Sequence, residues 1–438
     1  MSEYSLYNSH RITCSTDRYD SGYTGLPEKT LLQGITHVIF SFANMQRLAT
    51  GTSDKVHFEG FDGVNGIRTI REKFDSGTKF GAALGGWDES PWFNQTFESG
   101  DRAIFIDRIM DFVKEFNLDF IDIDWEYPGG GGVNYMNDTD ASKEREIEVF
   151  PVFLKELREK LQGEDGKQLS IAVAGKPNDI KVYKEKSKDI WASVDFVNIM
   201  AYDLMNRRDT ETAFPSSVKG ANAAVDAYLG LGLPAEKINL GIPLYSKFAK
   251  LADETCQGPL GCPLAPAEND DGSDAHTMDA VTFEKQNFQS TKVTTGAANG
   301  NTCGSDGFGC ASGLCCSKYG ACGNETEYCG YMCQYMFGDC DPTWLDMMPS
   351  FQRAIKNGKM DNDEGAMWFI DRPSEGDGKY NHFWSWDSPE IITKKINDIV
   401  FGRKLGGSMA WALGHDTYDW KHVKAIHDAH ASAPDKND

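Results

Sequence analysis

The sequence predicts an α/β protein built on a (β/α)8 barrel (TIM barrel), with a long insertion between the seventh and eighth strands. Eight short apolar segments alternate with longer amphipathic stretches, which is the pattern of such a barrel. One of these segments carries a row of carboxylates and is followed at once by glycines. The regular spacing breaks after residue 250, and residues 250–400 are too many for a single crossover.

The expected strands follow one another along the chain, and the first of them has the weakest pattern. They are 10–16, 35–43, 80–87, 119–128, 169–175, 194–203, 238–246 and 406–416. Helix-like stretches are expected between them at 62–75, 100–116 and 142–162. A doubly wound open sheet is the alternative, but no Gly-x-Gly-x-x-Gly turn follows the first strand. Within the insertion, 252–302 is typical of loops, and 364–387 is aromatic and in parts strand-like.

The fourth segment, DFIDIDWEYP at 119–128, is the most informative part of the chain. Asp122, Asp124 and Glu126 lie two residues apart, so on a strand they share one face. Such a row of like charges adds no stability. Acids near the carboxyl end of a barrel strand are typical of an active site. The residues between them are large and apolar, which argues against a solvated edge strand: Ile121, Ile123 and Trp125. The segment also lacks the central glycine and distal glutamate of a calcium loop.

Composition excludes several classes of function. The formal charge of −22 and a pI near 4.8 argue against nucleic acid and anionic membranes, and fit a neutral or cationic polysaccharide. A content of 40% hydrophobic and 12% aromatic residues supports a sizeable core. No run of 18 apolar residues is present, so we expect no membrane span.

Cysteine usage indicates an oxidising compartment. Ten of the 11 cysteines lie within residues 256–340, so we expect a secreted protein held by disulfides. The N-terminus, MSEYSLYNSH, lacks the basic start and apolar stretch of a signal peptide. We therefore expect Met1 to begin a mature or trimmed version of the chain. Cys256 and Cys262 are close enough to close a small loop, which leaves Cys14 as a single, buried thiol.

Residues 303–340 contain eight cysteines in a segment too short to bury a core. Eight cysteines allow 105 pairings, so their spacing alone gives no connectivity. A zinc site is disfavoured because the segment has no histidine and its paired cysteines fit no usual ligand spacing. A disulfide-stapled spacer without ligand contacts stays open as an alternative.

The segment DFIDIDWEYP, followed by glycine, resembles the DGxDxDxE strand of family-18 glycoside hydrolases, the chitinases, and we expect the fungal type. The resemblance extends from about residue 35 to 416. It implies a small α+β subdomain in the insertion. The expected domains are a catalytic barrel at 1–250 and 390–438, an insertion at 251–389, and a module at 301–341 within it. Phe120 stands where the family has glycine, and we expect it to point into the barrel below Asp122.

The resemblance also implies a mechanism, in which the acetamido oxygen of the substrate acts as nucleophile and the configuration is retained. Glu126 would be the acid and later the base. Asp124 would hold the acetamido N–H and stabilise the oxazolinium intermediate, and Asp122 would share a proton with it. Tyr202 would hydrogen-bond the acetamido carbonyl. Asp119 is out of phase with the inward row, so we expect it to be structural.

Further strand ends match family positions for substrate contacts. The expected contacts are Trp411 under the −1 sugar, Trp87 on the leaving-group side, Met200 on the floor, and Asp203, Tyr245 and Tyr127. Core packing is an equally common fate for Trp87 and Tyr245. Trp384 and Trp386 could belong to the core or to the cleft wall. Ala83 replaces a family serine that bonds one of the buried acids, so we expect the acid network to rest on other partners.

The spacing CCSKYGACGNETEYCGYMCQ resembles a hevein-type chitin-binding module. This resemblance implies sugar contacts from Ser317, Tyr319 and Tyr328. Ala321 occupies a place often held by an aromatic, so one stacking platform is missing. The implied disulfides are Cys303–Cys316, Cys310–Cys322, Cys315–Cys329 and Cys333–Cys340.

Together these observations predict a secreted, monomeric chitinase, with endo action favoured, that binds chitin and chitooligosaccharides and needs no metal or other cofactor. A carbohydrate-binding lectin on the same barrel is one alternative, but such relatives usually lack the glutamate at position 126. An endo-β-N-acetylglucosaminidase acting on glycoproteins is another, and the inserted module disfavours it.

Overall fold

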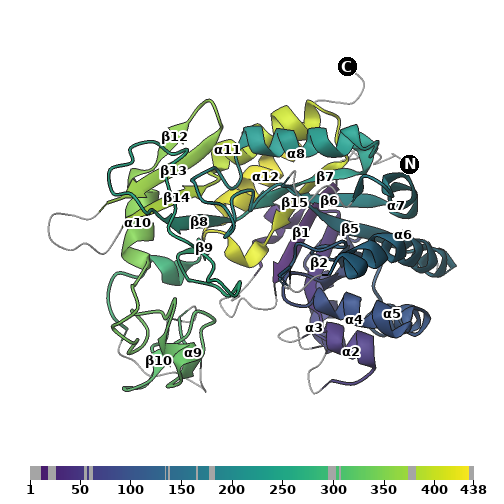
Figure 1. The fold of residues 1–438 in the computed structure, drawn as a ribbon, viewed down its shortest axis with the longest axis horizontal. Coiled ribbons are helices and arrows are strands. Elements are labelled where there is room, and N and C mark those ends of the chain that lie inside the picture. The colour runs from purple at the N-terminus through teal and green to yellow at the C-terminus, as the bar shows by residue number, and fades with distance from the viewer. Residues whose placement is uncertain are drawn as a thin grey trace.

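The computed structural model describes residues 11–17, 26–53, 57–58, 63–133, 135–136, 139–163, 166–176, 183–293, 302–304, 307–372 and 381–433. The N-terminal decapeptide considered above and the side chain of Cys14 lie outside the described part. In the described part, eight parallel strands close into a barrel in the order β1-β15-β7-β6-β5-β4-β3-β2. Strands β1 and β15 come from the two ends of the chain and pair with each other, which closes the barrel (Figure 1).

All eight expected strands are present, which confirms the predicted barrel. Several of them end earlier than expected: β4 ends two residues before Glu126, β7 ends at Pro243, and β6 and β15 end at Met200 and Trp411. The barrel strands are β1 (Arg11–Asp17), β2 (His37–Ala43), β3 (Lys79–Gly85), β4 (Phe120–Asp124), β5 (Gln168–Ala174), β6 (Phe196–Met200), β7 (Ile238–Pro243) and β15 (Gly407–Trp411).

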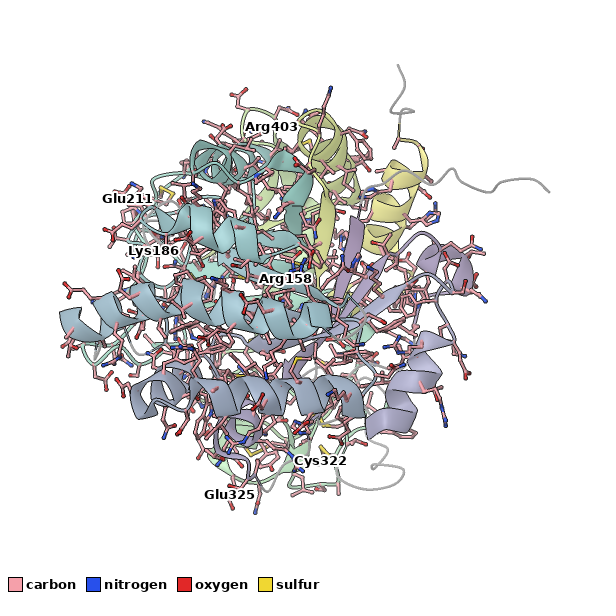
Figure 2. The ribbon with its side chains drawn as sticks, turned by 90° about the vertical axis from the view of Figure 1, so that its right-hand side faces the viewer. Arg158, Lys186, Glu211, Cys322, Glu325 and Arg403 are labelled. Atoms are coloured by element: carbon pink, nitrogen blue, oxygen red, sulfur yellow. A yellow bond between two sulfur atoms is a disulfide. The ribbon has the colours of Figure 1, made fainter. Side chains whose placement is uncertain are left out.

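Helices surround the barrel, and two of them, α5 and α6, lie side by side across one face of the molecule (Figure 2). The three expected helical stretches appear as α3, α5 and α6. The helices around the barrel are α1 (Lys29–Leu32), α2 (Met45–Thr50), α3 (Gly63–Arg71), α4 (Pro91–Ser99), α5 (Arg102–Glu115), α6 (Asp140–Gly163), α7 (Ser187–Ser193), α8 (Val218–Gly230), α11 (Pro389–Lys395) and α12 (Lys421–Ala431). Shorter turns are η2 (Ala235–Lys237), η5 (Leu413–His415) and the π-helix η4 (Ile396–Phe401). Among the described helices, none is long and apolar enough to cross a membrane.

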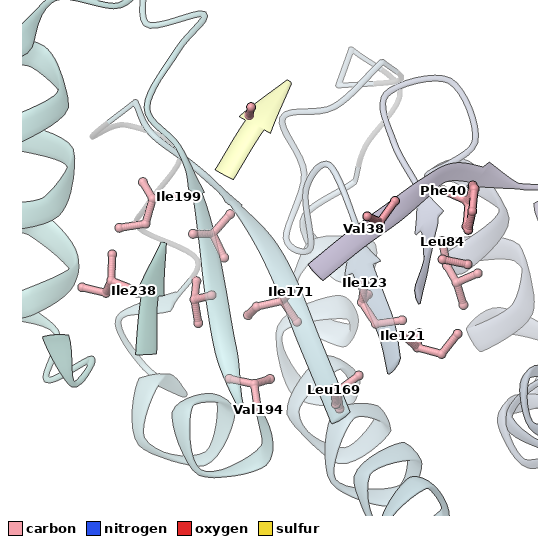
Figure 3. Close-up of a cluster of buried hydrophobic side chains, with 14 of the residues drawn as sticks. Val38, Phe40, Leu84, Ile121, Ile123, Leu169, Ile171, Val194, Ile199 and Ile238 are labelled. Carbon is pink, nitrogen blue, oxygen red and sulfur yellow. The ribbon is translucent and has the colours of Figure 1, made fainter. Parts of the chain in front are cut away.

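Strand β4 alternates between two environments. Ile121 and Ile123 are buried with the strand residues Leu169 and Ile171 and with the helices (Figure 3). Phe120 has the opposite parity and is buried in the barrel interior, 5.9 Å from the ring of Phe196. Burying such side chains stabilises the fold by about 1.5–3 kcal/mol each. This burial fixes the register of β4 and turns the even-numbered positions, including the acids, inward.

The inward position of Phe120 agrees with the expectation from the sequence. A Cβ on Gly81 of the neighbouring strand would lie 2.5 Å from the Phe120 ring, so only glycine leaves room for it. Asp119 lies outside the inward row, as expected. Its Oδ2 accepts hydrogen bonds from Arg71 Nη1 at 2.9 Å and from the Phe80 amide at 2.8 Å. Asp119 therefore ties α3 to the start of β3.

The insertion forms an antiparallel sheet in the order β12-β13-β14-β8-β9. Its first strand starts at Tyr245, within the range that the sequence assigned to the barrel. Trp384 and Trp386 are 0% and 5% exposed in the core of this subdomain, so both are core residues. Its elements are β8 (Tyr245–Lys250), β9 (Met278–Thr282), η3 (Lys285–Phe288), α10 (Met348–Asn357), β12 (Lys359–Asp361), β13 (Ala366–Asp371) and β14 (His382–Trp386).

The disulfide-rich module lies at one end of the molecule. Figure 2 labels its residues Cys322 and Glu325 at the bottom of the view, and Arg403 at the opposite end. It consists of a two-stranded sheet, β10 (Cys315–Cys316) and β11 (Cys322–Gly323), and the turn of helix α9 (Thr326–Cys329). The four disulfides implied by the resemblance are all formed, as is the loop between Cys256 and Cys262. Three sulfurs lie close enough together to suggest a metal site, but each is in a disulfide and offers no thiolate: Cys303, Cys310 and Cys316.

Candidate active site

A groove with a cavity of about 660 Å³ opens at the carboxyl ends of the barrel strands. It combines residues from the loops after several strands with residues from the insertion and from the disulfide-rich module. The lining includes Phe42, Trp87, Asp88, Asp124, Glu126, Tyr127, Met200, Tyr202, Asp203, Arg207, Arg208, Tyr245, Lys247, Glu268, Asp274, Asp279, Lys318, Tyr319 and Trp411. The carboxyl end of the strands is where barrel enzymes carry out chemistry.

Asp122 is the deepest of the three acids, and neighbouring strands hold it. Ser170 of β5 donates a short hydrogen bond to its Oδ1, and Asn198 Nδ2 of β6 donates to the same oxygen at 3.0 Å. Asn239 of β7 in turn donates to Asn198 at 2.9 Å. Burial raises the pKa of Asp122 to about 6, although both hydrogen bonds act in the opposite direction.

Asp124 is 5% exposed and stands one step nearer the groove. Burial raises its pKa well above the ordinary value, and the charges of Glu126 and Asp122 raise it further. Its Oδ1 is buried and has no hydrogen-bond partner among the described residues. Asp124 can therefore share a proton with its neighbours, and its free oxygen can accept an N–H from a bound molecule.

Glu126 is the uppermost acid and lines the groove. Burial raises its pKa to about 8; a hydrogen bond with Tyr127 lowers it, and the charges of Asp203 and Asp88 raise it. Ser90 positions its backbone, because Ser90 Oγ accepts from the Glu126 amide at 2.8 Å. A carboxyl with a pKa near neutrality can hold a proton and still give it up, as a general acid must.

Tyr202 and Tyr245 form one side of the groove with Asp203, which follows β6. Burial, followed by the charges of nearby acids, raises the pKa of both phenols well above 10, so each remains a hydroxyl. Tyr245 Oη donates to Asp203 Oδ1 at 3.0 Å, and Lys247 Nζ donates to the same oxygen at 2.6 Å. A Cβ on Gly241 would lie 2.8 Å from the Tyr202 ring, so this glycine admits the ring to the groove.

Apolar surfaces complete the lining. Trp411, the last residue of β15, lies 5.5 Å from the ring of Phe42 between ring centroids. Met200 and Tyr127 also line the groove, and the Arg208 guanidinium lies 5.8 Å from the centroid of the Trp87 ring. All ten residues predicted for catalysis and substrate binding thus lie in or beneath this groove. Of the three sugar contacts implied for the module, Tyr319 lines the groove. Ser317 is 3% exposed within a turn, and Tyr328 lies outside the groove lining, with its ring against Gly323.

Several residues that shape the site were not predicted from the sequence. The acid network rests on partners other than position 83, as expected, and these are Ser170 and Asn198; Ala83 itself is buried. Both are polar residues inside otherwise apolar, buried strands, and this is the signal that could have identified them. Ser90 carries no comparable signal, because it lies among other polar residues, and Lys247 carries none, because a lysine on a strand is ordinarily an exposed residue.

One wall of the groove is a polar network that was not predicted from the sequence either. Arg208 donates to the carbonyl of Gly131 at 2.7 Å and stacks over the ring of Tyr135 at 3.8 Å. Tyr135 Oη donates to Glu268 at 2.7 Å, and Arg207 pairs with Asp274 at 3.2 Å. The loops after β4 and β6 are thereby fastened to the insertion loop that precedes β9.

The barrel, the buried acids and the aromatic groove are together typical of a glycoside hydrolase. The family model described as Glycosyl hydrolases family 18 matches residues 4–416. The chain belongs to this family.

Relatives within the family are distant. Chitotriosidase-1 of Mus musculus is 29% identical over 245 residues, which cover 52% of this chain and 50% of that protein. Chitinase 1 of Aphanocladium album is 27% identical over 246 residues, covering 49% of this chain and 55% of that protein. The chain thus matches about half the length of these relatives. A class V chitinase from Nicotiana tobaccum, solved in complex with NAG4, has the same fold, with a TM-score of 0.61 at 16% identity; the match covers 97% of this chain and 100% of that chain.

Proposed function

We propose that this chain is a chitinase that hydrolyses β-1,4 bonds between N-acetylglucosamine units, with retention of configuration and with Glu126 as acid and base. The single observation that carries the proposal is the position of Glu126. It is a carboxyl of raised pKa above two buried carboxylates, and it faces a groove lined with aromatic rings. Two of the relatives described above are named chitinases and the third is named chitotriosidase, which supports the substrate class.

In the first step, the Glu126 carboxyl donates its proton to the glycosidic oxygen. The acetamido oxygen of the same sugar attacks the anomeric carbon as the bond to the leaving sugar breaks, and an oxazolinium ion forms. Asp124 Oδ1, which has no hydrogen-bond partner within the described part of the chain, accepts the acetamido N–H, and the charge of Asp124 stabilises the cation. The Tyr202 hydroxyl, which keeps its proton because burial raises its pKa, donates to the acetamido oxygen.

In the second step, the Glu126 carboxylate takes a proton from a water molecule, which attacks the anomeric carbon from the face that the leaving sugar vacated. The bond to the acetamido oxygen breaks, and the carboxyl is restored. Two inversions at one carbon give retention. Asp122 acts through Asp124: its hydrogen bonds from Ser170 and Asn198 hold a second carboxyl close enough for the two to share a proton.

Glu126→Gln tests this assignment. We expect hydrolysis of a chitin hexamer to fall by about 100-fold or more, because the lost step is proton transfer. Binding of the hexamer should persist, because glutamine preserves the shape of the side chain. A matched control is Glu115→Gln, since Glu115 is exposed on helix α5. Proton NMR of the first products should show the β-anomer. An active Glu126→Gln protein, or α-anomer as the first product, would overturn the mechanism.

The lectin alternative predicts that the unaltered chain binds the hexamer and never cleaves it, so the same assay decides between a chitinase and a lectin.

We also propose that the module at 301–341 is hevein-like, that the protein is of the fungal type and acts as a monomer, and that it is secreted. The five disulfides support an oxidising compartment. The domain ranges given above are part of this proposal.

A further inference from the structure

The disulfide-rich module is fastened to the wall of the groove through aromatic contacts. The ring of Tyr331 stacks on that of His276 with centroids 4.3 Å apart, and Trp344 meets both rings edge-on. Tyr331 and Met332 also pack against the hydrophobic core of the insertion. His276 belongs to the same loop as Asp274, which lines the groove and pairs with Arg207. The position of the module is therefore set by a loop that also builds the groove.

The turn between β10 and β11 is held in one shape. The Gly320 amide donates to the Ser317 carbonyl at 2.9 Å, and the Ser317 amide donates to the Ala321 carbonyl at 2.8 Å. Gln334 Nε2 donates to the same Ser317 carbonyl at 2.8 Å. Gly320 has a φ of 74°, a conformation that glycine adopts at little cost. Residues 318 and 319 at the tip of this turn are therefore presented by a stapled, hydrogen-bonded support.

Both tip residues line the cavity that contains Glu126 and Trp411. The Tyr319 side chain is 51% exposed, which is unusual for a large ring. Lys318 Nζ lies 5.2 Å from the centroid of the Tyr319 ring and 5.9 Å from that of Tyr331. The Lys318 ammonium thus lies near both the exposed ring of Tyr319 and the ring of Tyr331, which holds the module against the insertion. An exposed, oriented aromatic face at the edge of a groove is suited to stacking on a sugar.

We propose that Tyr319 and Lys318 form an outer sugar subsite of the catalytic groove, so that one N-acetylglucosamine chain touches the module and the acids at once. This inference rests on the proposed function, because it takes the same ligand class. The module then acts as part of the groove and not as a separate anchor. Oligomers long enough to reach Tyr319 gain affinity, and shorter ones do not.

Calorimetric titration in the Glu126→Gln background tests the proposal, because that protein does not consume the ligand. We expect one hexamer to bind per chain. Adding Tyr319→Ala should weaken hexamer binding by about five- to tenfold, the value of one lost aromatic contact, and trimer binding by less than about twofold. Tyr319→Phe should restore the affinity, because it keeps the ring. A matched control is Tyr418→Ala, since Tyr418 is 69% exposed and is not part of the groove lining.

Binding of two hexamers per chain would overturn the proposal, because it would mean an independent site on the module. Equal losses for hexamer and trimer, or no loss with Tyr319→Ala, would also overturn it. Hydrolysis of the hexamer by the unaltered chain is measured separately. Its absence would contradict the proposed function, while the titration would still decide whether the module and the groove share one ligand.

Discussion

Replacing Glu126 should change the stability of the protein in a pH-dependent way. The pKa of this carboxyl is about 8 in the folded protein, against an ordinary value of 4.5. Between these two pH values the folded state binds more protons than the unfolded state. The free energy of unfolding therefore falls as the pH rises through this window, and the full loss is reached above pH 8. Below pH 4.5 the group is protonated in both states and contributes no loss.

The magnitude follows from the two pKa values. A difference of roughly 3.5 pKa units corresponds to about 5 kcal/mol, at about 1.4 kcal/mol per unit. Glutamine keeps the shape of the side chain and does not ionise, so Glu126→Gln removes this loss. The charge on Glu126 also raises the pKa of Asp124, and removing it relieves that carboxyl as well. Relative to the unaltered chain, the variant should therefore gain up to about 5 kcal/mol between pH 4 and pH 9.

Differential scanning calorimetry at pH 4, 7 and 9 measures this effect. Unfolding entropy of about 2.1 cal/mol/K per residue makes about 0.9 kcal/mol/K for the 438 residues, so the Tm gain at pH 9 should reach roughly 5 °C. Glu115→Gln, at an exposed position on α5, is the control and should show no such trend. A Tm difference between variant and parent that stays constant from pH 4 to pH 9 would refute the argument that Glu126 is a half-buried acid whose charged form destabilises the fold.

Two further predictions concern the pH profile and the buried ion pair between Asp387 and Lys395 of helix α11. Hydrolysis should decline above about pH 8, because Glu126 must be protonated to act as an acid. Asp88→Asn should move that decline to lower pH by less than about one unit, since the charge of Asp88 raises the pKa of Glu126. An unmoved profile would contradict this coupling between Asp88 and Glu126. Lys395 and Asp387 form an ion pair that is 0% exposed, so Lys395→Met should lower the free energy of unfolding in urea by about 3–5 kcal/mol. Lys394→Met, in an exposed pair one residue away, should cost less than about 1 kcal/mol, and similar losses for both would contradict the importance of burial.

Local periodicity was sufficient to predict much of the fold. Side chains alternate along a strand with a period of two, so the segment around Ile121 and Asp122 carries its own two faces whatever surrounds it. The same alternation predicted the inward stack of acids and the inward Phe120. The end of β4 was less predictable, because the backbone after Asp124 is held by Ser90, a residue 36 positions away along the chain.

The sequence by itself determined the eight strands, the row of acids on the fourth strand and the clustering of cysteines, because each of these follows from spacing within a short segment. Only the tertiary structure decided that Ser170 and Asn198 hold Asp122, and that Tyr319 faces the groove from a module some 200 residues beyond the acids. The physical reason is that such contacts depend on how strands pair and how rings such as His276 and Tyr331 pack across loops. No periodic pattern within either segment specifies its distant partner.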